Sequence, residues 1–350
     1  MSPRVSVLLP NLNNRPYLEE RMETILNQTF GDWELIVVDS HSDDGAWEFF
    51  QQCAKEDPRI KLFQDSRQGI YNSWNTCIRL ARGEYVYFAT SDDTMEPTFL
   101  ETMVKALDEH PECDLAHCKL KIIDERGQPH PSRVSWDLFY GTLYFGDLID
   151  KKHIRLAPHD GILYCCVRTV YTSITQLLIH RSLFDKIGLF LTNYGPVADF
   201  EWGMRASLVA NIIHVPEYLA TWRVRGGQAT DLDFLDSVEL LTQFLKMINQ
   251  ALLTARSIRP DLVEGIKKRE LQYFYSREIF LSTLRSHKSI AKRCGVALRW
   301  LFVDPKIVWE CCRARLGSEK AFAELMSPVD FSRKLIGKYN LQNHVRCVDE

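Results

Sequence analysis

The stretch that decides the fold is residues 84–93, which read Glu-Tyr-Val-Tyr-Phe-Ala-Thr-Ser-Asp-Asp. Its apolar part has the length and the aromatic and β-branched content of a buried strand. The strand leads directly into Asp92 and Asp93, where like charges raise each other's pKa unless a cation offsets them. Alone, this stretch fits either a Mg²⁺ or Mn²⁺ site built of oxygen ligands or a solvated turn that caps the helix predicted from Pro97.

Working outward, the same strand-then-helix pattern recurs through the amino-terminal part of the chain. Apolar runs typical of buried strands lie at residues 5–9, 35–38, 60–63 and 84–89. Helical spacing of apolar residues lies at 15–28, 46–55, 73–81 and 97–110. This alternation predicts an α/β fold with a mostly parallel sheet and helices on both faces, and residues 212–215 are its predicted last strand.

Composition narrows the class of protein. The chain has 350 residues, with 43 basic and 46 acidic side chains, so it lacks the basic excess of a dedicated nucleic-acid binder. Its ten cysteines include no C-x-x-C or zinc-type spacing. We find no signal peptide and no apolar run long enough to cross a membrane. The sequence therefore predicts a reduced, cytoplasmic protein.

Two regions depart from the alternating pattern. Residues 111–180 include many glycines, prolines and aromatic residues and suit an acceptor-binding insertion or a lid. Residues 231–350 show long helical periodicity and hold 20 basic against 15 acidic side chains. We therefore predict a catalytic domain at 1–230 and a C-terminal helical extension at 231–350. Three roles stay open for the extension: a helical cap on the catalytic domain, a homo-oligomer interface, or peripheral contact with anionic lipid.

The loop after the first strand argues against two other α/β enzymes. It reads Pro10-Asn11-Leu12-Asn13-Asn14 and contains no glycine. A nicotinamide-dependent dehydrogenase would carry G-x-G-x-x-G at this turn, and a sugar nucleotidyltransferase would need a glycine-rich phosphate loop with basic residues. Neither pattern is present.

A series of motifs, in order, resembles the family-two nucleotide-sugar glycosyltransferases, which have a GT-A fold. The resemblance covers residues 4–110 and, less closely, 180–230. The matching blocks are Val5 to Asn11, Gln28-Thr29-Phe30, Trp33 to Asp39, Ser42-x-Asp44-Gly45, Gly69 to Asn72, Ala81 to Tyr85, Ser91-Asp92-Asp93, Leu183 to Phe190 and Asp199 to Arg205.

The resemblance implies a set of donor-binding residues. Asp39 matches the carboxylate that accepts hydrogen bonds from the nucleotide base, although the acid that usually follows it is replaced by Ser40. The other implied contacts to the nucleotide sugar come from Pro10, Asn11, Gly69, Asn75, Ser91, Asp92, Arg223 and Arg225. Arg225 stands where the family usually has histidine. The arginine keeps a positive charge near the phosphates.

The resemblance also implies how transfer occurs. Inversion requires a carboxylate that removes the proton of the acceptor hydroxyl, and Asp199 matches that position, although Ala198 replaces the preceding acid. Asp199 also suits the N-terminus of a helix, and the two roles are compatible. Asp92, supported by Asp93, matches the site for Mn²⁺ or Mg²⁺, but Thr90 replaces the acid that usually opens this motif.

The expected function is that of an inverting, metal-dependent glycosyltransferase. It would move one hexosyl or N-acetylhexosaminyl unit from a nucleotide-diphosphate sugar, in the first place a UDP-sugar, to a hydroxyl of a glycan or lipid-linked acceptor. Single addition is expected because the Gln-x-x-Arg-Trp motif of processive synthases is absent. The resemblance places such enzymes in bacterial cell-envelope polysaccharide synthesis, at the inner face of the membrane. The replaced acids leave one alternative, a catalytically silent sugar-nucleotide-binding or scaffolding protein.

Overall fold

The computed structural model describes residues 2–131, 141–166, 170–226, 238–316 and 328–348. Strands and helices alternate in its amino-terminal part: β1 (Val5–Asn11), α1 (Arg15–Leu26), β2 (Trp33–Asp39), α2 (Ala46–Glu56), β3 (Ile60–Gln64), α3 (Ile70–Leu80), β4 (Tyr85–Phe88) and α4 (Phe99–Glu109). Every residue of β1, β2 and β4 is buried, as expected for strands covered on both faces. The predicted alternation is confirmed.

The middle of the chain adds short elements and completes most of the sheet. They are β5 (Leu115–Ile123), α5 (Thr142–Phe145), η2 (Gly146–Asp150), β6 (His153–Arg155), α6 (His159–Cys166), η3 (Ile174–Gln176), β7 (Leu177–His180), α7 (Ser182–Ile187), η4 (Thr192–Val197), α8 (Ala198–Ser207) and β8 (Ile212–Arg223). β8 is longer than the predicted strand, because two register shifts against β5, on either side of Lys119, let pairing continue past Pro216 to Arg223.

The carboxy-terminal part is mostly helical. It comprises α9 (Val238–Ile258), α10 (Pro260–Val263), α11 (Lys268–Ser286), α12 (Ile290–Val303), α13 (Pro305–Leu316), α15 (Pro328–Lys338), η6 (Leu341–His344) and β9 (Val345–Cys347). The prediction of helices alone is therefore incomplete, because β9 joins the sheet as an edge strand beside β6. The predicted boundary near residue 230 falls at 227–237, outside the described residues. No described helix is both long enough and apolar enough to cross a membrane.

The sheet has the strand order β3-β2-β1-β4-β7-β5-β8-β6-β9. The pairings place β6 and β7 antiparallel to their neighbours, while the other strands all run in one direction. The mostly parallel sheet is thus confirmed, with two reversed strands that periodicity did not predict. Strands β1 to β4 consequently end at the same edge of the sheet.

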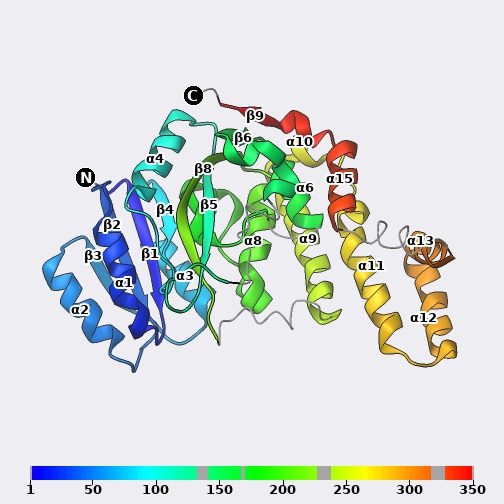
Figure 1. Cartoon of the computed structure of the whole chain (residues 1–350), viewed down its shortest axis with the longest axis horizontal. Coiled ribbons are helices and arrows are strands. Elements are labelled where there is room, and N and C mark those ends of the chain that lie inside the picture. The colour runs from blue at the N-terminus through cyan, green and yellow to red at the C-terminus, as the bar shows by residue number, and fades with distance from the viewer. Residues whose placement is uncertain (1, 132–140, 167–169, 227–237, 317–327, 349–350) are drawn as a thin grey trace.

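Two cores cover the two faces of the sheet. Val7 and Leu9 of β1 face the core that α1, α2 and α4 close, whereas Leu8 faces the core that α3, α7 and α8 close. This second core continues into α9 and α11, through residues such as Leu240 and Leu271. Figure 1 shows β1 to β3 at one end of the molecule and α11 to α13 at the other.

Candidate active site

The candidate site is the edge at which β1, β2 and β4 end. Asn11 and Asp39 are paired residues at the ends of β1 and β2, and Ser91 and Asp92 follow β4 directly. Loops at the carboxyl ends of neighbouring parallel strands form the usual ligand crevice of open α/β sheets. The structure thus brings these predicted residues to a common edge.

Asn11 and Asp39 form a buried polar pair. Asn11 Nδ2 donates to Asp39 Oδ1 over 2.9 Å, and Asp39 Oδ2 accepts from the backbone N–H of Ser42 over 2.8 Å. The amide oxygen of Asn11 is buried and has no hydrogen-bond partner in the described part of the chain, which is costly unless a donor reaches it. Pro10 precedes this pair within β1. The pair therefore offers acceptors for a ligand that carries N–H groups.

The loop after β2 is held in place by a residue that sequence reasoning did not select. Arg67 donates to the backbone oxygens of Ser40 and His41, over 3.1 and 2.6 Å. Two residues later, Gly69 adopts φ +91° before α3 begins, a conformation that favours glycine. Arg67 also donates to the Asp43 carboxylate over 3.1 Å. An arginine in a loop carries no sequence signal of this role, because the partners that fix the loop after β2 are mostly backbone oxygens.

The charge of Asp92 after β4 is balanced by Arg225, which lies two residues past the end of β8. Arg225 Nε donates to Asp92 Oδ2 over 2.8 Å, and Arg225 Nη2 donates to Asn14 Oδ1 over 2.7 Å. Asn14 Nδ2 in turn donates to Ser91 Oγ over 2.8 Å. Asn14 therefore connects the loops after β1, β4 and β8, a role that becomes visible only in three dimensions.

Both carboxylate oxygens of Asp93 accept hydrogen bonds from other residues of the protein. Its two carboxylate oxygens accept from the backbone N–H of Arg223 over 2.7 Å and from the hydroxyl of Thr90 over 2.5 Å. Burial and the neighbouring Asp92 raise the pKa of Asp93 to about 7. Asp93 thus fastens the loop after β4 to the end of β8, and it does so with the threonine that replaces the usual acid.

Arg223 and Asn75 also have partners within the protein. The Arg223 side chain is 1% exposed and donates to the backbone oxygens of Asp92, Asp124 and Glu125 and to the carboxylate of Glu20. The Asn75 amide donates to the Phe190 oxygen over 2.9 Å and accepts from the Phe190 N–H over 3.0 Å. Their predicted contacts to the donor stay predictions, whereas their contacts within the protein hold loops around the site.

Asp199 reaches the same edge through Tyr71. Asp199 lies in the first turn of α8, and its Oδ1 accepts from the Tyr71 hydroxyl over 2.8 Å and from the Phe200 N–H over 3.0 Å. Tyr71 lies in the first turn of α3, which starts at the carboxyl edge of the sheet. Burial raises the pKa of Asp199 to about 6, as expected for a carboxylate tuned for proton transfer near neutral pH.

The donor set for a cation is small. The described residues contain no group of three or more His, Cys, Asp or Glu side chains arranged to hold a metal ion. Asp92 could nevertheless serve as a ligand to a divalent cation, because its second oxygen, Oδ1, has no hydrogen-bond partner among the described residues. Mg²⁺ commonly binds through one or two carboxylates together with substrate phosphates. A cation here would thus depend on the phosphates of a bound nucleotide.

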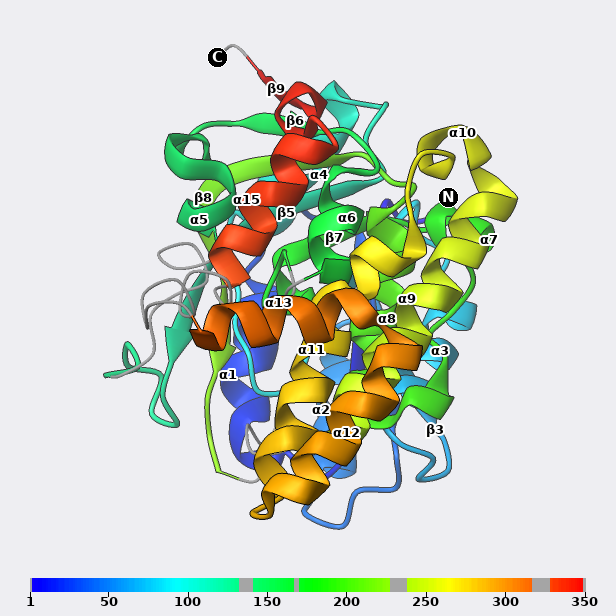
Figure 2. The ribbon, with the colours of Figure 1, turned by 90° about the vertical axis from the view of Figure 1, so that its right-hand side faces the viewer.

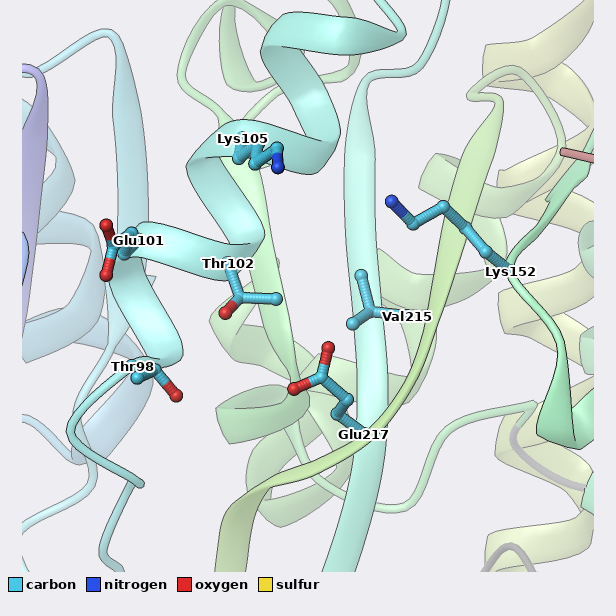
Figure 3. Close-up of a pocket in the computed structure, with 7 residues that line it drawn as sticks. All are labelled: Thr98, Glu101, Thr102, Lys105, Lys152, Val215 and Glu217. Carbon is cyan, nitrogen blue, oxygen red and sulfur yellow. The ribbon is translucent and has the colours of Figure 1, made fainter. Parts of the chain in front are cut away.

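A separate depression lies between α4 and β8 (Figure 3). It has a volume of about 320 Å³ and is lined by Thr98, Glu101, Thr102, Lys105, Lys152, Val215 and Glu217. None of the predicted site residues lines it, and its mixed acidic and basic side chains give it no single preference for ligand charge. We therefore place the active site at the strand edge.

Comparisons with known proteins identify a family for the amino-terminal part of the chain. The family model described as Glycosyl transferase family 2 matches residues 6–167. The putative teichuronic acid biosynthesis glycosyltransferase TuaG of Bacillus subtilis is 32% identical over 128 residues, which are 36% of this chain and 50% of TuaG. Curated relatives at 30% identity or more are matched over about a third to a half of their own length.

Two solved structures share the fold. TarS 1–349 of S. aureus, in complex with UDP, aligns over 98% of this chain and 92% of that chain, with a TM-score of 0.58 and 16% identity. The mannosyltransferase PcManGT from Pyrobaculum calidifontis, in complex with GDP-Man and Mn²⁺, aligns over 97% and 88%, with a TM-score of 0.50 and 16% identity. The family match and the shared fold lead to one conclusion: residues 6–167 carry a glycosyl transferase family 2 domain, and the chain has the GT-A fold.

Proposed function

We propose that the protein is an inverting glycosyltransferase that moves a single sugar from a UDP-sugar to a hydroxyl of a glycan or lipid-linked acceptor with the help of a divalent cation. The observation that carries this proposal is the position of Asp199, which is bound to Tyr71 at the strand edge and has a pKa raised to about 6. TarS complexes with UDP and UDP-GlcNAc support a nucleotide-sugar donor.

The transfer step follows from the acid–base properties of Asp199. Its carboxylate accepts the proton of the acceptor hydroxyl while that oxygen forms a bond to the anomeric carbon. The bond between the anomeric carbon and the diphosphate oxygen breaks, and the diphosphate leaves with the electron pair. A pKa of about 6 keeps most Asp199 side chains ionised at pH 7 while making them stronger bases than an ordinary carboxylate.

Asp92 would hold the cation through Oδ1, and Asp93 would support the loop from behind. A bound cation supplies Lewis-acid stabilisation of the negative charge on the diphosphate. Arg225 adds a guanidinium beside Asp92, at 2.8 Å, where it can also bind phosphate oxygens. The Mn²⁺ complex of PcManGT supports use of a divalent cation.

The buried pair of Asn11 and Asp39 would bind the nucleotide base, because its oxygens accept hydrogen bonds. Ser91 and the backbone at Pro10 and Gly69 would line the ribose and sugar. We further propose that transfer takes place in the cytoplasm and contributes to a cell-envelope polysaccharide, which the role given in the name of TuaG supports.

The decisive test compares Asp199→Asn with Asp92→Asn. Asp199→Asn should keep UDP affinity but lose at least ~10²-fold in turnover, because it removes the base. Asp92→Asn should weaken Mn²⁺-dependent UDP binding, measured by calorimetry. Asp185→Asn, an exposed change on α7, is the matched control and should alter neither property. Unchanged turnover in Asp199→Asn would remove it as the base.

The alternative, a silent binding protein, is motivated by Thr90, Ser40 and Ala198, which stand where the family usually has acids. It predicts that the wild type binds UDP-sugars but neither transfers nor hydrolyses them with any acceptor tested. In that case Asp199→Asn and the wild type would be indistinguishable in every assay.

A further inference from the structure

Helix α12 has an apolar face that no other described element covers. Its members recur at helical spacing and are all exposed: Ile290, Cys294, Leu298, Leu301 and Phe302. Leu298 is 60% exposed and Phe302 is 94% exposed. No residue of α12 is buried. We call this set the α12 apolar face.

The opposite side of α12 has a partner. Val296, Ala297 and Trp300 pack on a small core around Phe280 of α11. One side of α12 therefore packs on α11, and its apolar face is directed away from α11. Single exposed apolar side chains are ordinary, but a contiguous stripe marks an interaction surface.

The α12 apolar face is surrounded by positive charge. Residues 285–313 contain seven basic side chains, namely Arg285, Lys288, Lys292, Arg293, Arg299, Lys306 and Arg313, and two acidic ones. Both acids have partners: Asp304 is paired with Arg269 at 3.0 Å, and Glu310 accepts from Tyr273. Lys292 and Arg299 are exposed and, by helical spacing, lie beside the apolar stripe. The region therefore presents a positive surface with an apolar centre.

Helix α12 lies at one end of the molecule, so a flat surface could contact its apolar face. Figure 1 shows α12 and α13 at the end of the molecule that is farthest from β3, and Figure 2 shows both helices in front when this end faces the viewer. Trp309 of α13 is 69% exposed at the same end, and tryptophan favours the boundary between water and lipid.

We propose that the α12 apolar face docks on the surface of an anionic lipid bilayer, with α12 lying in the headgroup region. Interfacial helices combine an apolar stripe with flanking Lys and Arg in this way, and anionic headgroups attract the basic residues. A second copy of the chain fits less well, because a symmetric contact would bring two positive surfaces together.

The test is co-sedimentation of the full chain with vesicles of phosphatidylcholine, with and without phosphatidylglycerol. We expect binding only to the vesicles that contain phosphatidylglycerol, and weaker binding at high salt. Leu298→Ser with Phe302→Ser should lower the affinity about tenfold or more through lost apolar burial. Lys292→Glu with Arg299→Glu should abolish the preference for phosphatidylglycerol.

Leu253→Ser is the matched control, because Leu253 is an exposed leucine on α9, away from α12, and this change should leave vesicle binding intact. Circular dichroism should show the same helix content for all variants, since each replaced side chain is exposed. Equal vesicle binding by Leu298→Ser with Phe302→Ser and by the wild type would overturn the proposal. So would a dimer in solution that the same variant converts to a monomer, because a second copy would then cover the face.

Discussion

Asp199 and Asp92 lie at one edge of the sheet but have different partners. Burial raises the pKa of Asp199 to about 6, and the hydrogen bond that Asp199 accepts from the neutral Tyr71 hydroxyl only partly offsets this effect. Asp92 instead accepts from the guanidinium of Arg225. These different surroundings suit the two carboxylates to the different tasks that we propose for them, proton transfer for Asp199 and charge binding for Asp92.

Removal of the Tyr71 hydroxyl should change the pKa of Asp199, the proposed base, without removing its carboxylate. The hydrogen bond from Tyr71 stabilises ionised Asp199 and lowers its pKa against the larger effect of burial. In Tyr71→Phe we expect the pKa of Asp199 to rise, so the acid limb of the kcat/KM profile should move to higher pH. Initial rates between pH 5 and pH 8, from about one unit below that pKa to about two units above it, would measure the shift.

The control is Tyr194→Phe in η4, because Tyr194 is half-exposed and the charged groups near its hydroxyl are Glu201 and Arg205 rather than Asp199. Its pH profile should match that of the wild type. An unchanged acid limb in Tyr71→Phe would mean that another group sets the limb.

Arg225 should compete with a cation for Asp92. Its Nε lies 2.8 Å from Asp92 Oδ2, so Arg225→Ala removes a positive charge next to the carboxylate. We expect Mn²⁺ to bind about tenfold more tightly in the absence of nucleotide, which corresponds to ~1.4 kcal/mol, a modest part of a charge pair at this distance. UDP without metal should bind more weakly, since the phosphates lose a cationic partner. Calorimetry measures both affinities.

Arg225→Lys is the matched variant, because it keeps the charge while losing the planar donor pair. It should resemble the wild type in Mn²⁺ affinity. If Arg225→Ala bound Mn²⁺ no better than Arg225→Lys, the charge of Arg225 would have no influence on Asp92.

At the scale of elements, the strand ends were predictable and the contacts across the sheet were not. Asn11, Asp39 and Asp92 each follow an apolar run, and parallel strands place their ends together, so periodicity alone indicated one edge. Asn14 and Arg225 are hydrogen-bonded although they lie 211 residues apart in the sequence. No local sequence pattern predicts a contact between residues so far apart. Likewise, β7 lies between β4 and β5, an order that depends on long-range pairing.

The contact between α6 and α8 sets where α8 lies. A Cβ added to Gly161 in α6 would come within 2.5 Å of the backbone nitrogen of Leu208, at the end of α8. Gly161→Ala should therefore push the helices apart and lower the free energy of unfolding by about 1–3 kcal/mol. Urea denaturation followed by circular dichroism would measure the loss.

Gly295→Ala serves as the comparison, because nothing lies within 4 Å of a Cβ at that position in α12. It should leave stability unchanged or raise it by up to ~1 kcal/mol, through better helix propensity. Equal stability in Gly161→Ala and Gly295→Ala would show that α6 and α8 can separate at little cost.

At the scale of the whole molecule, a chain of buried side chains joins separate elements. His214 Nε2 lies 2.9 Å from the Ile149 oxygen, which can only accept, so this nitrogen carries the proton. His214 Nδ1 then accepts from His117 Nδ1 at 3.1 Å, and His117 Nε2 accepts from the Gln176 amide at 3.3 Å. These bonds require both rings to be neutral, and they connect η2, β8, β5 and η3.

The hydrogen bonds of a third buried histidine, His153, also require a neutral ring. His153 Nδ1 donates to the Lys151 oxygen over 2.9 Å, and its Nε2 accepts from Arg155 Nη1 over 3.2 Å. A proton on Nε2 would break the second bond and face a guanidinium. Burial, and then Arg155, lower the pKa of His153 to about 4. Burial likewise lowers the pKa values of His117 and His214.

These shifts make stability depend on pH. A histidine with a lowered pKa in the folded state takes up a proton first in the unfolded chain, so its contribution is present above pH ~6.5 and is lost as the pH falls toward 4. Asp199 and Asp93 act in the opposite sense, because their raised pKa values cost stability as the pH rises through about 6 and about 7. The contributions of the histidines and of the aspartates change over overlapping pH ranges, so a variant that removes one titrating group is needed to separate them.

His153→Asn provides that separation, since it removes one titrating ring and leaves a donor for the Lys151 oxygen. Between pH 5 and pH 6 we expect the slope of unfolding free energy against pH to decrease by about 1 kcal/mol per pH unit, close to the value of one proton. Ile154→Val, a buried change in the same strand, should lower stability at every pH by about 0.5–1.5 kcal/mol and leave the slope unchanged. Urea denaturation at several pH values measures both quantities. Parallel curves for His153→Asn and Ile154→Val would mean that His153 takes up its proton equally in the folded and unfolded chains, contrary to its burial against Arg155.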